Sequence, residues 1–377
     1  MKTFLFGLLS FGTLLGARAQ STREILYIGT YSTRGSEGIY AFAFDRASAT
    51  LRPLTPTKND KSPSFLRLHP SGNFLYSANE AKDAGGPGTG SVSAYAVDRG
   101  TGALRPLNEQ PSGGQNPCHI SIDRTGKFAF VSNYGGSLSV LPINPNGTLG
   151  AAVDRIQPTG SGPNQSRQEG PHVHSAMVSP DNRFVYVMDL GTDQVYCYAL
   201  NAQTGKLTPG KVPSVSVRPG SGPRHLAFAP NGRYAYLVEE LTSSVAVLAR
   251  DAQTGALVLT TDGITTLPTN YTESNTSADI HTDPAGKFLY QSNRGRNALA
   301  IFAIGSDGTL SPAGEQPVPK TPRNFLVDPK GEFVFVAGQD ADALQVYRRN
   351  AQTGQLTPAG QPVRVPAPVC ITTLGAQ

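Results

Sequence analysis

Apolar and polar positions alternate along short stretches of the chain, and this alternation returns in seven similar units. Each unit contains a tight turn followed by a leucine, and successive leucines lie roughly 45 to 58 residues apart, a period typical of propeller blades or solenoid coils. The seven leucines are Leu51, Leu104, Leu149, Leu207, Leu257, Leu310 and Leu356. Period-two alternation broken by glycine-containing turns is typical of strands joined as hairpins. The sequence therefore predicts an all-β chain folded as a seven-bladed β-propeller.

Each unit also contains two further predicted strands, one before and one after a Pro/Asp-x-Gly turn. A unit then has four strands, which we name A to D from the propeller axis outward. The first unit lacks strand A, because Ile25–Tyr31 already has the pattern of strand B, whereas Val369–Thr373 is a strand A without a unit. We expect these two segments to share one blade and close the ring, which removes its exposed edges. Residues 20–377 would then form a single domain.

Composition agrees with a turn-rich β protein, since the 377 residues include 41 glycines and 30 prolines. The net charge of +5 comes from scattered basic residues. No basic stripe is present, so nucleic acid is not expected as a partner. We expect a monomer that needs no cofactor.

The N-terminus has the three parts of a secretory signal peptide. Lys2 supplies the positive charge, residues 4–15 form an apolar run, and Ala17-Arg18-Ala19 offers a small-x-small cleavage site. The apolar run is short for a bilayer span, and no cysteine follows it to carry a lipid. We therefore expect residues 1–19 to be removed, leaving a periplasmic or secreted protein without a membrane span. A retained N-terminal anchor is the alternative.

The chain has three cysteines, Cys118, Cys197 and Cys370. An odd number leaves at least one free thiol or an intermolecular bond in an oxidising compartment. A bridge between Cys118 and Cys370 is one interpretation, because both lie on A strands, but buried free thiols that pack as small apolar groups are the interpretation we favour. His119 follows Cys118 directly, and strand alternation would turn these two side chains to opposite faces.

Polar side chains gather at one kind of position, the start of strand A and the end of strand B. Antiparallel pairing places both positions on one rim of the ring, and five of the six histidines lie there. The A-strand residues are His119, His172, His174, Arg224, His225, Asp279, His281 and Arg323. The B-strand residues are Asn79, Glu80, Asn133, Tyr134, Asp189, Glu239, Glu240, Asn293, Arg294 and Gln339. Because A strands line the central channel, we expect these groups to converge at its mouth as a binding or active site.

The polar motifs at this rim follow one another in a fixed order along the chain. They are Gly222-Pro223-Arg224-His225, Glu240-Leu241-Thr242-Ser243-Ser244-Val245, Ala278-Asp279-Ile280-His281 with Asn293-Arg294, and Pro322-Arg323 with Ala337-Gly338-Gln339. In this order they resemble the lactonase family of seven-bladed β-propellers. That family includes bacterial propeller-type 6-phosphogluconolactonases and is related to fungal carboxy-cis,cis-muconate cyclase. The bacterial enzymes that typify the family are cytoplasmic, whereas this chain is expected to be exported, so its natural substrate stays open.

The resemblance implies that the protein opens a sugar lactone with activated water. By motif, it places the catalytic set on His174, Arg224, Glu240 and Arg294. The residues expected to bind substrate are His119, Asn133, Tyr134, His172, His225, Asp279, His281, Arg323 and Gln339. Chemically, either Glu240 or His174 suits the base, Arg224 suits the oxyanion, and the other arginines suit a carboxylate or phosphate. The expected partner is a small, anionic lactone.

Other chemistries fit these residues less well. The oxygen ligands Glu80, Asn133, Glu240, Asp279 and Asn293 suit calcium, but the neighbouring arginines and histidines repel a divalent cation, so no metal is expected. A serine nucleophile is expected in a G-x-S-x-G motif at a strand-to-helix turn, and the sequence has no such motif at a turn of that kind. Two rival functions stay open. One is a non-catalytic exported propeller that binds a protein or glycan, although a chain without tryptophan offers few anchors. The other is a lactonising cyclase.

Overall fold

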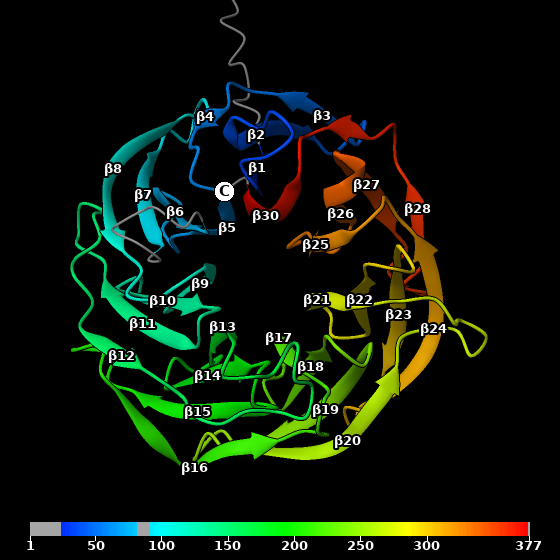
Figure 1. The fold of residues 1–377 in the computed structure, drawn as a ribbon. Helices are drawn as coiled ribbons and strands as arrows, with labels where there is room; N and C mark the ends of the chain where they lie inside the picture. The colour runs from blue at the N-terminus through cyan, green and yellow to red at the C-terminus, as the bar shows by residue number, and fades with distance from the viewer. Residues whose placement is uncertain (1–23, 81–89, 376–377) are drawn as a thin grey trace, which may run out of the picture.

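Seven antiparallel sheets surround a central channel in the computed structural model, which describes residues 24–80 and 90–375 (Figure 1). The first sheet contains β30 (Pro368–Leu374), β1 (Glu24–Thr30), β2 (Gly38–Asp45), β3 (Thr50–Pro53) and β4 (Thr57–Lys58). The second contains β5 (Pro63–Leu68), β6 (Phe74–Asn79), β7 (Ser91–Val97) and β8 (Leu104–Pro111). The third contains β9 (Pro117–Ile122), β10 (Phe128–Asn133), β11 (Ser137–Pro142) and β12 (Asp154–Ile156).

The remaining four sheets continue the ring in chain order. The fourth contains β13 (Val173–Val178), β14 (Phe184–Asp189), β15 (Gln194–Leu200) and β16 (Leu207–Ser216). The fifth contains β17 (Pro223–Phe228), β18 (Tyr234–Glu239), β19 (Ser244–Arg250) and β20 (Leu257–Thr265). The sixth contains β21 (Ser277–Thr282), β22 (Phe288–Asn293), β23 (Ala298–Ile304) and β24 (Leu310–Pro317). The seventh contains β25 (Pro322–Val327), β26 (Phe333–Gly338), β27 (Ala343–Arg349), β28 (Leu356–Pro358) and β29 (Val363–Arg364), with a short 3-10 helix at Gln339–Ala341.

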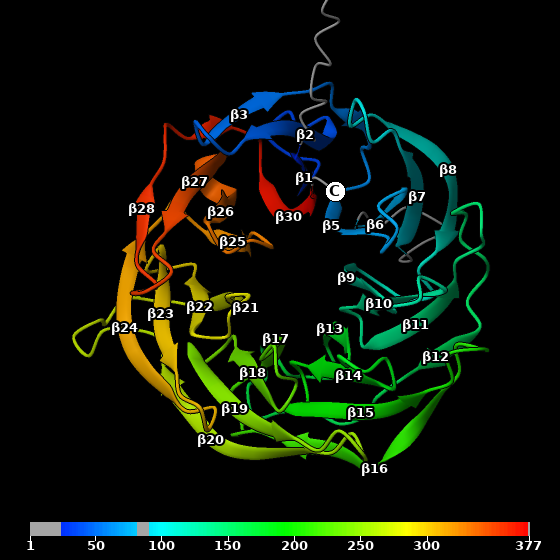
Figure 2. The ribbon, with the colours of Figure 1, turned by 180° about the vertical axis from the view of Figure 1, so that it is seen from behind.

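The predicted seven-bladed propeller is therefore confirmed, and so is its closure. β1 pairs with β30 from Ile25 opposite Leu374 to Thr30 opposite Pro368, so the two ends of the chain complete one blade. Seen from behind, the ring is closed in the same way (Figure 2). The expected signal peptide lies outside the described residues. Within those residues, no helix has the length and apolar character needed to cross a membrane.

The repeated turn before each leucine joins neighbouring blades. Buried tyrosines on the second strand of five blades donate their hydroxyl to the carbonyl of the turn glycine in the next blade, as Tyr186 does to Gly255 at 2.8 Å. Gly255 has φ +75°, a left-handed conformation that glycine adopts without strain. Each interface between blades also encloses one apolar cluster, for example Tyr186 with Leu237. The repeat thus holds the ring together while leaving its axis free for other groups.

Every inner strand carries one β-bulge close to its start. In β17, Pro223 pairs with Glu239 and His225 with Val238, so Arg224 is an extra residue opposite the partner strand. Corresponding register shifts occur in the other six inner strands. A bulge re-aims side chains, so two consecutive residues of one strand can both face the channel. The expectation that Cys118 and His119 point to opposite faces is therefore wrong, because the bulge of β9 turns both toward the axis.

Candidate functional site

A cavity of about 220 Å³ lies at the end of the channel where the inner strands begin. We call it the mouth cavity. Its lining includes Glu80, Cys118, Tyr134, Arg167, His174, Arg224, Glu240, Arg294 and Arg323. The bulges supply Cys118, His174, Arg224 and Arg323, whereas Glu80, Tyr134, Glu240 and Arg294 directly follow second strands. The four residues expected to be catalytic are thus brought together.

Glu240 is the centre of the mouth cavity. It accepts hydrogen bonds from Arg224 Nη1 at 2.7 Å and from Arg167 Nη2 at 2.7 Å, and Arg294 Nη2 lies 3.0 Å away. Burial alone would raise the pKa of this carboxyl, but the charges of Arg294 and Arg224 hold it well below its usual range. Glu240 is therefore a permanently ionised anchor for three guanidinium groups. A carboxylate held in this way is a weak base.

His174 lies beside this anchor and is buried to the same degree. Its Nε2 accepts a hydrogen bond from Arg224 Nη1 at 2.5 Å, because a guanidinium can only donate. Burial and the charge of Arg224 lower the pKa of His174 well below its usual value. The imidazole is therefore neutral at pH 7, with its proton on Nδ1 facing Cys118 Sγ at 3.9 Å.

Donor atoms of three arginines in the mouth cavity have no protein acceptor among the described residues, one of them being the buried Nε of Arg294. Arg224 uses Nε for the carbonyl of Ala278 and Nη1 for Glu240, which leaves Nη2 available. Arg323 makes no ion pair there and lies over the ring of Tyr31 at 5.4 Å. The cavity lining carries four arginines against two glutamates, a formal excess of two positive charges. The arrangement suits an anionic ligand.

The sequence patterns did not identify Arg167 as a residue of the site. It comes from the long segment between β12 and β13, which carries no regular strand to mark it. Gln168 holds this segment in place by donating to the carbonyl of Leu190 and to Asp193. Arg167 also donates to the hydroxyl of Tyr134 at 3.2 Å. The only sequence feature that could have indicated Arg167 is the length of this segment on the polar rim.

The adjacent residues Glu239 and Glu240 face different surroundings, and only Glu240 lines the mouth cavity. Glu239 points away from the mouth cavity and accepts a hydrogen bond from Ser244 Oγ at 2.6 Å. Burial and, to a smaller extent, the nearby Asp262 raise the pKa of Glu239 to about 7. Glu239 Oε1 and Asp262 Oδ1 are both buried without a partner among the described residues, so a proton shared between them would satisfy both.

Several expected binding residues lie elsewhere, and the prediction of one common mouth needs correction. Asn133 is buried against Ser137 within its own hairpin, and Gln339 is on the short 3-10 helix. His172 stacks on Tyr134 at 4.4 Å, at the edge of the mouth cavity. The other four residues line a second cavity deeper in the channel: His119, His225, Asp279 and His281. Their position deeper in the channel follows from the bulges, because a bulged residue such as Arg224 lines the mouth cavity and the residue after it faces further along the channel.

The cysteines are free and buried, as favoured from the sequence. Burial raises the pKa of Cys118 beyond the physiological range, so its thiol faces the mouth cavity uncharged. No group of three His, Cys, Asp or Glu side chains among residues 24–80 and 90–375 has a metal-binding arrangement. The absence of a metal requirement stays a prediction.

Comparison with known proteins gives one consistent group. The sequence profile of the family described as lactonase, 7-bladed beta-propeller, matches residues 25–373. The chain is 34% identical over 356 residues to a 6-phosphogluconolactonase of Bacillus subtilis, covering 94% of this chain and 99% of that protein. It is 35% identical to the 6-phosphogluconolactonase of Formosa agariphila, covering 88% and 94%. A solved structure described as the periplasmic gluconolactonase of Pseudomonas aeruginosa has a TM-score of 0.87 at 32% identity, covering 94% of this chain and 100% of that one.

Proposed function

Because the chain belongs to the lactonase family of seven-bladed β-propellers, we propose that it is a lactone hydrolase acting in the mouth cavity on a sugar lactone with an anionic group. The observation that carries this proposal is the set of arginines gathered around Glu240. Ring opening of a lactone develops negative charge on the carbonyl oxygen, and fixed cations stabilise such charge. The relatives named as 6-phosphogluconolactonases support a phosphorylated or otherwise anionic sugar lactone as substrate.

In the proposed reaction, water attacks the lactone carbonyl and the ring C–O bond breaks. Arg224 Nη2, which has no acceptor among the described residues, donates to the developing oxyanion. For His174 to take the proton of the attacking water, its neutral imidazole must exchange the hydrogen bond that Nε2 accepts from Arg224 Nη1 for one from the water, because Nδ1 already carries a proton. The imidazolium formed is 3.9 Å from Glu240 Oε2, which stabilises it. The proton then passes to the leaving ring oxygen.

Glu240 has a positioning role in this proposal. Its two oxygens fix the orientation of Arg224 and Arg294, and its lowered pKa makes it a poor proton acceptor. Arg323 has no ion pair among the described residues, so it is the side chain that would hold a phosphate or carboxylate of the substrate. Glu80 is the cavity's other acceptor, with Oε2 buried and unbonded to any described residue, so Glu80 is the residue that competes with His174 as base, and Glu80→Gln tests it.

Export to the periplasm, with removal of residues 1–19, is part of the proposal. It is supported by the tripartite N-terminus and by the relative from Pseudomonas aeruginosa that is named periplasmic. A sugar phosphate is not an obvious substrate in that compartment, so a carboxylated lactone is a natural competitor to the phosphorylated one.

The test is hydrolysis of 6-phosphoglucono- and glucono-δ-lactone by the purified protein, with the spontaneous rate subtracted. We expect kcat/KM to be higher for the phosphorylated lactone, and this preference to fall about tenfold or more in Arg323→Gln. Arg52→Gln, which removes an exposed arginine on β3, is the matched control. Wild-type rates no faster than the spontaneous reaction would support the rival binding scaffold, and lactone formation from an unsaturated diacid would support the cyclase.

A further inference from the structure

A second cavity of about 260 Å³ lies further along the channel, toward the C-terminal ends of the inner strands. We call it the rear cavity. It takes one residue from each inner strand directly after the bulge, among them His119, His225 and Asp279. The next inward-facing positions add Arg67 and His281. None of these residues takes part in the reaction proposed for the mouth cavity.

A layer of rings separates the two cavities. The centroids of Phe65 and His119 are 4.3 Å apart, those of His119 and His225 are 5.6 Å apart, and those of His225 and His174 are 5.4 Å apart. Only a space of about 10 Å³ remains between the cavities, enough for a single water molecule. The rear cavity is reached from its own end, where 34% of the His281 side chain is exposed. A molecule in the rear cavity is therefore not part of the mouth site.

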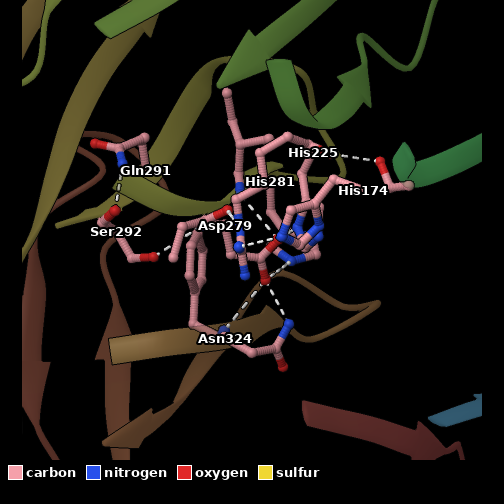
Figure 3. Close-up of polar contacts among 12 residues, drawn as sticks. His174, His225, Asp279, His281, Gln291, Ser292 and Asn324 are labelled. Carbon is pink, nitrogen blue, oxygen red and sulfur yellow. Dashed lines mark hydrogen bonds and ion pairs between the residues drawn. The ribbon is translucent and has the colours of Figure 1, made fainter. Parts of the chain in front are cut away.

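The rear cavity contains a preorganised hydrogen-bonding cluster around Asp279 (Figure 3). Its carboxylate accepts from His225 Nδ1 at 2.8 Å, from His281 Nε2 at 3.0 Å and from Asn324 Nδ2 at 2.5 Å. Two backbone N–H groups complete its partners. Because Nδ1 of His225 donates to Asp279, its Nε2 is left with a lone pair, and this atom is buried without a partner among the described residues.

Arg67 supplies a cation without an ion-pair partner among the described residues of the same cavity. This half-buried arginine makes no side-chain hydrogen bond or ion pair with the described residues, and Asp279 is already engaged by two imidazoles. His119, 4% exposed, adds a second buried ring nitrogen, Nδ1, without a partner. A half-buried guanidinium and two unpaired imidazole nitrogens are costly unless a ligand satisfies them.

From this geometry we propose that the rear cavity is a second binding site, for a small hydroxycarboxylate. The carboxylate pairs with the planar fork of Arg67, and a ligand hydroxyl donates to Nε2 of His225. The side chains of Met177 and Leu326 also line the rear cavity and give an apolar surface for the carbon chain. The volume suits a molecule of metabolite size.

The proposal stands on the rear cavity alone, but it connects with the proposed function. Opening a lactone with water yields a chain with one carboxylate and at least one hydroxyl, so the product of the mouth cavity belongs to the ligand class of the rear cavity. Binding of such a ligand does not require that the protein be a lactonase, so the two proposals can fail separately.

The test is isothermal titration of the full protein with gluconate. We expect Arg323→Gln, which alters only the mouth, to keep one gluconate site, and Arg67→Gln to weaken that site at least tenfold. Arg67→Lys keeps the charge without the fork and should give an intermediate loss, so the proposal stays testable if Arg67→Gln folds poorly. Arg52→Gln is the control on the outer surface and should bind as the wild type does.

A second comparison isolates the hydroxyl. Lactate and propionate differ by one hydroxyl, so lactate should bind the Arg323→Gln protein more tightly, and its binding should shift the imidazole resonances of His225. Unchanged gluconate affinity in both Arg67 variants, equal binding of lactate and propionate, or no gluconate site remaining in Arg323→Gln would each overturn the proposal. A protein without lactonase activity that still binds gluconate through Arg67 would overturn only the proposed function.

Discussion

Glu240→Gln is the substitution that best separates a positioning carboxylate from a catalytic base. The change keeps the size of the side chain and removes the charge that faces three arginines. If Glu240 is a positioning residue, its substitution disturbs the orientation of Arg224 and lowers the stability of the fold. As a base, it would affect the rate and its pH dependence without a large effect on folding.

The magnitude follows from the burial of each pair. Arg224 and Glu240 each have 3% of their side chain exposed and Arg294 has 15%, whereas Arg167 is 36% exposed and contributes little. Removing one partner of a buried ion pair typically costs about 3–5 kcal/mol, because the remaining charge is left buried and uncompensated. For a chain of this size, that corresponds to a fall in Tm of roughly 4–7 °C. Phosphate added to the buffer should restore part of the loss by binding among the arginines.

The assay combines thermal melting with steady-state hydrolysis, and the chain offers a matched control. Glu239→Gln is the same change one residue earlier, where the side chain faces Ser244 and Asp262 instead of the arginines. The pKa of Glu239 is raised to about 7, so its stabilising proton is bound at low pH and is lost as the pH rises through 7. Glu239→Gln should therefore match the wild-type Tm at pH 4.5 and exceed it at pH 8, with kcat/KM unchanged.

Two outcomes would contradict this reasoning. If Glu240→Gln keeps the wild-type Tm but loses all activity, Glu240 acts as the base and the electrostatic argument fails. If Glu240→Gln and Glu239→Gln lower Tm equally, the loss of stability in Glu240→Gln does not come from its arginine partners.

Three further predictions concern other parts of the molecule. With His174 as base, wild-type kcat/KM should stay constant in a pH-stat assay down to values below 6.5, since burial and Arg224 lower the histidine's pKa; an inflection near 6.5 or above would contradict this. Deleting residues from Pro368 onward should remove cooperative unfolding in calorimetry, because β1 loses its inner partner. The intact mass of the protein from its native source should correspond to a chain beginning at Gln20, and a retained Met1 would refute export.

The fold could be predicted because short-range sequence patterns determine it. Alternation, turn glycines and the spare strand Val369–Thr373 together specify seven blades and their closure, and β30 lies where that segment predicts. The grouping of His174, Arg224, Glu240 and Arg294 could be predicted because second residues of inner strands and residues after second strands recur in sequence. The catalytic role that the family resemblance implies for these four residues stays a prediction.

The other features of the site depend on residues that follow no repeated sequence pattern. Arg167 comes from an irregular loop whose course is set by hydrogen bonds of Gln168 with distant partners. Which of two adjacent glutamates faces the channel depended on where β18 ends, after Glu239. Boundaries of this kind shift by a residue or two with tertiary packing, and one residue is enough to exchange the two faces of a strand.

The division of the channel into two cavities follows from the bulges. In a regular strand, Arg224 and His225 would face opposite sides, and only one of them would reach the axis. With one extra residue in each inner strand, Arg224 lines the mouth cavity and His225 lines the rear cavity. All seven blades therefore contribute a side chain to the rear cavity, and all but the first contribute another to the mouth cavity. The arginines at the mouth and the histidines at the rear can consequently differ in charge while sharing the same seven strands, which gives one propeller room along its axis for both sites that we propose.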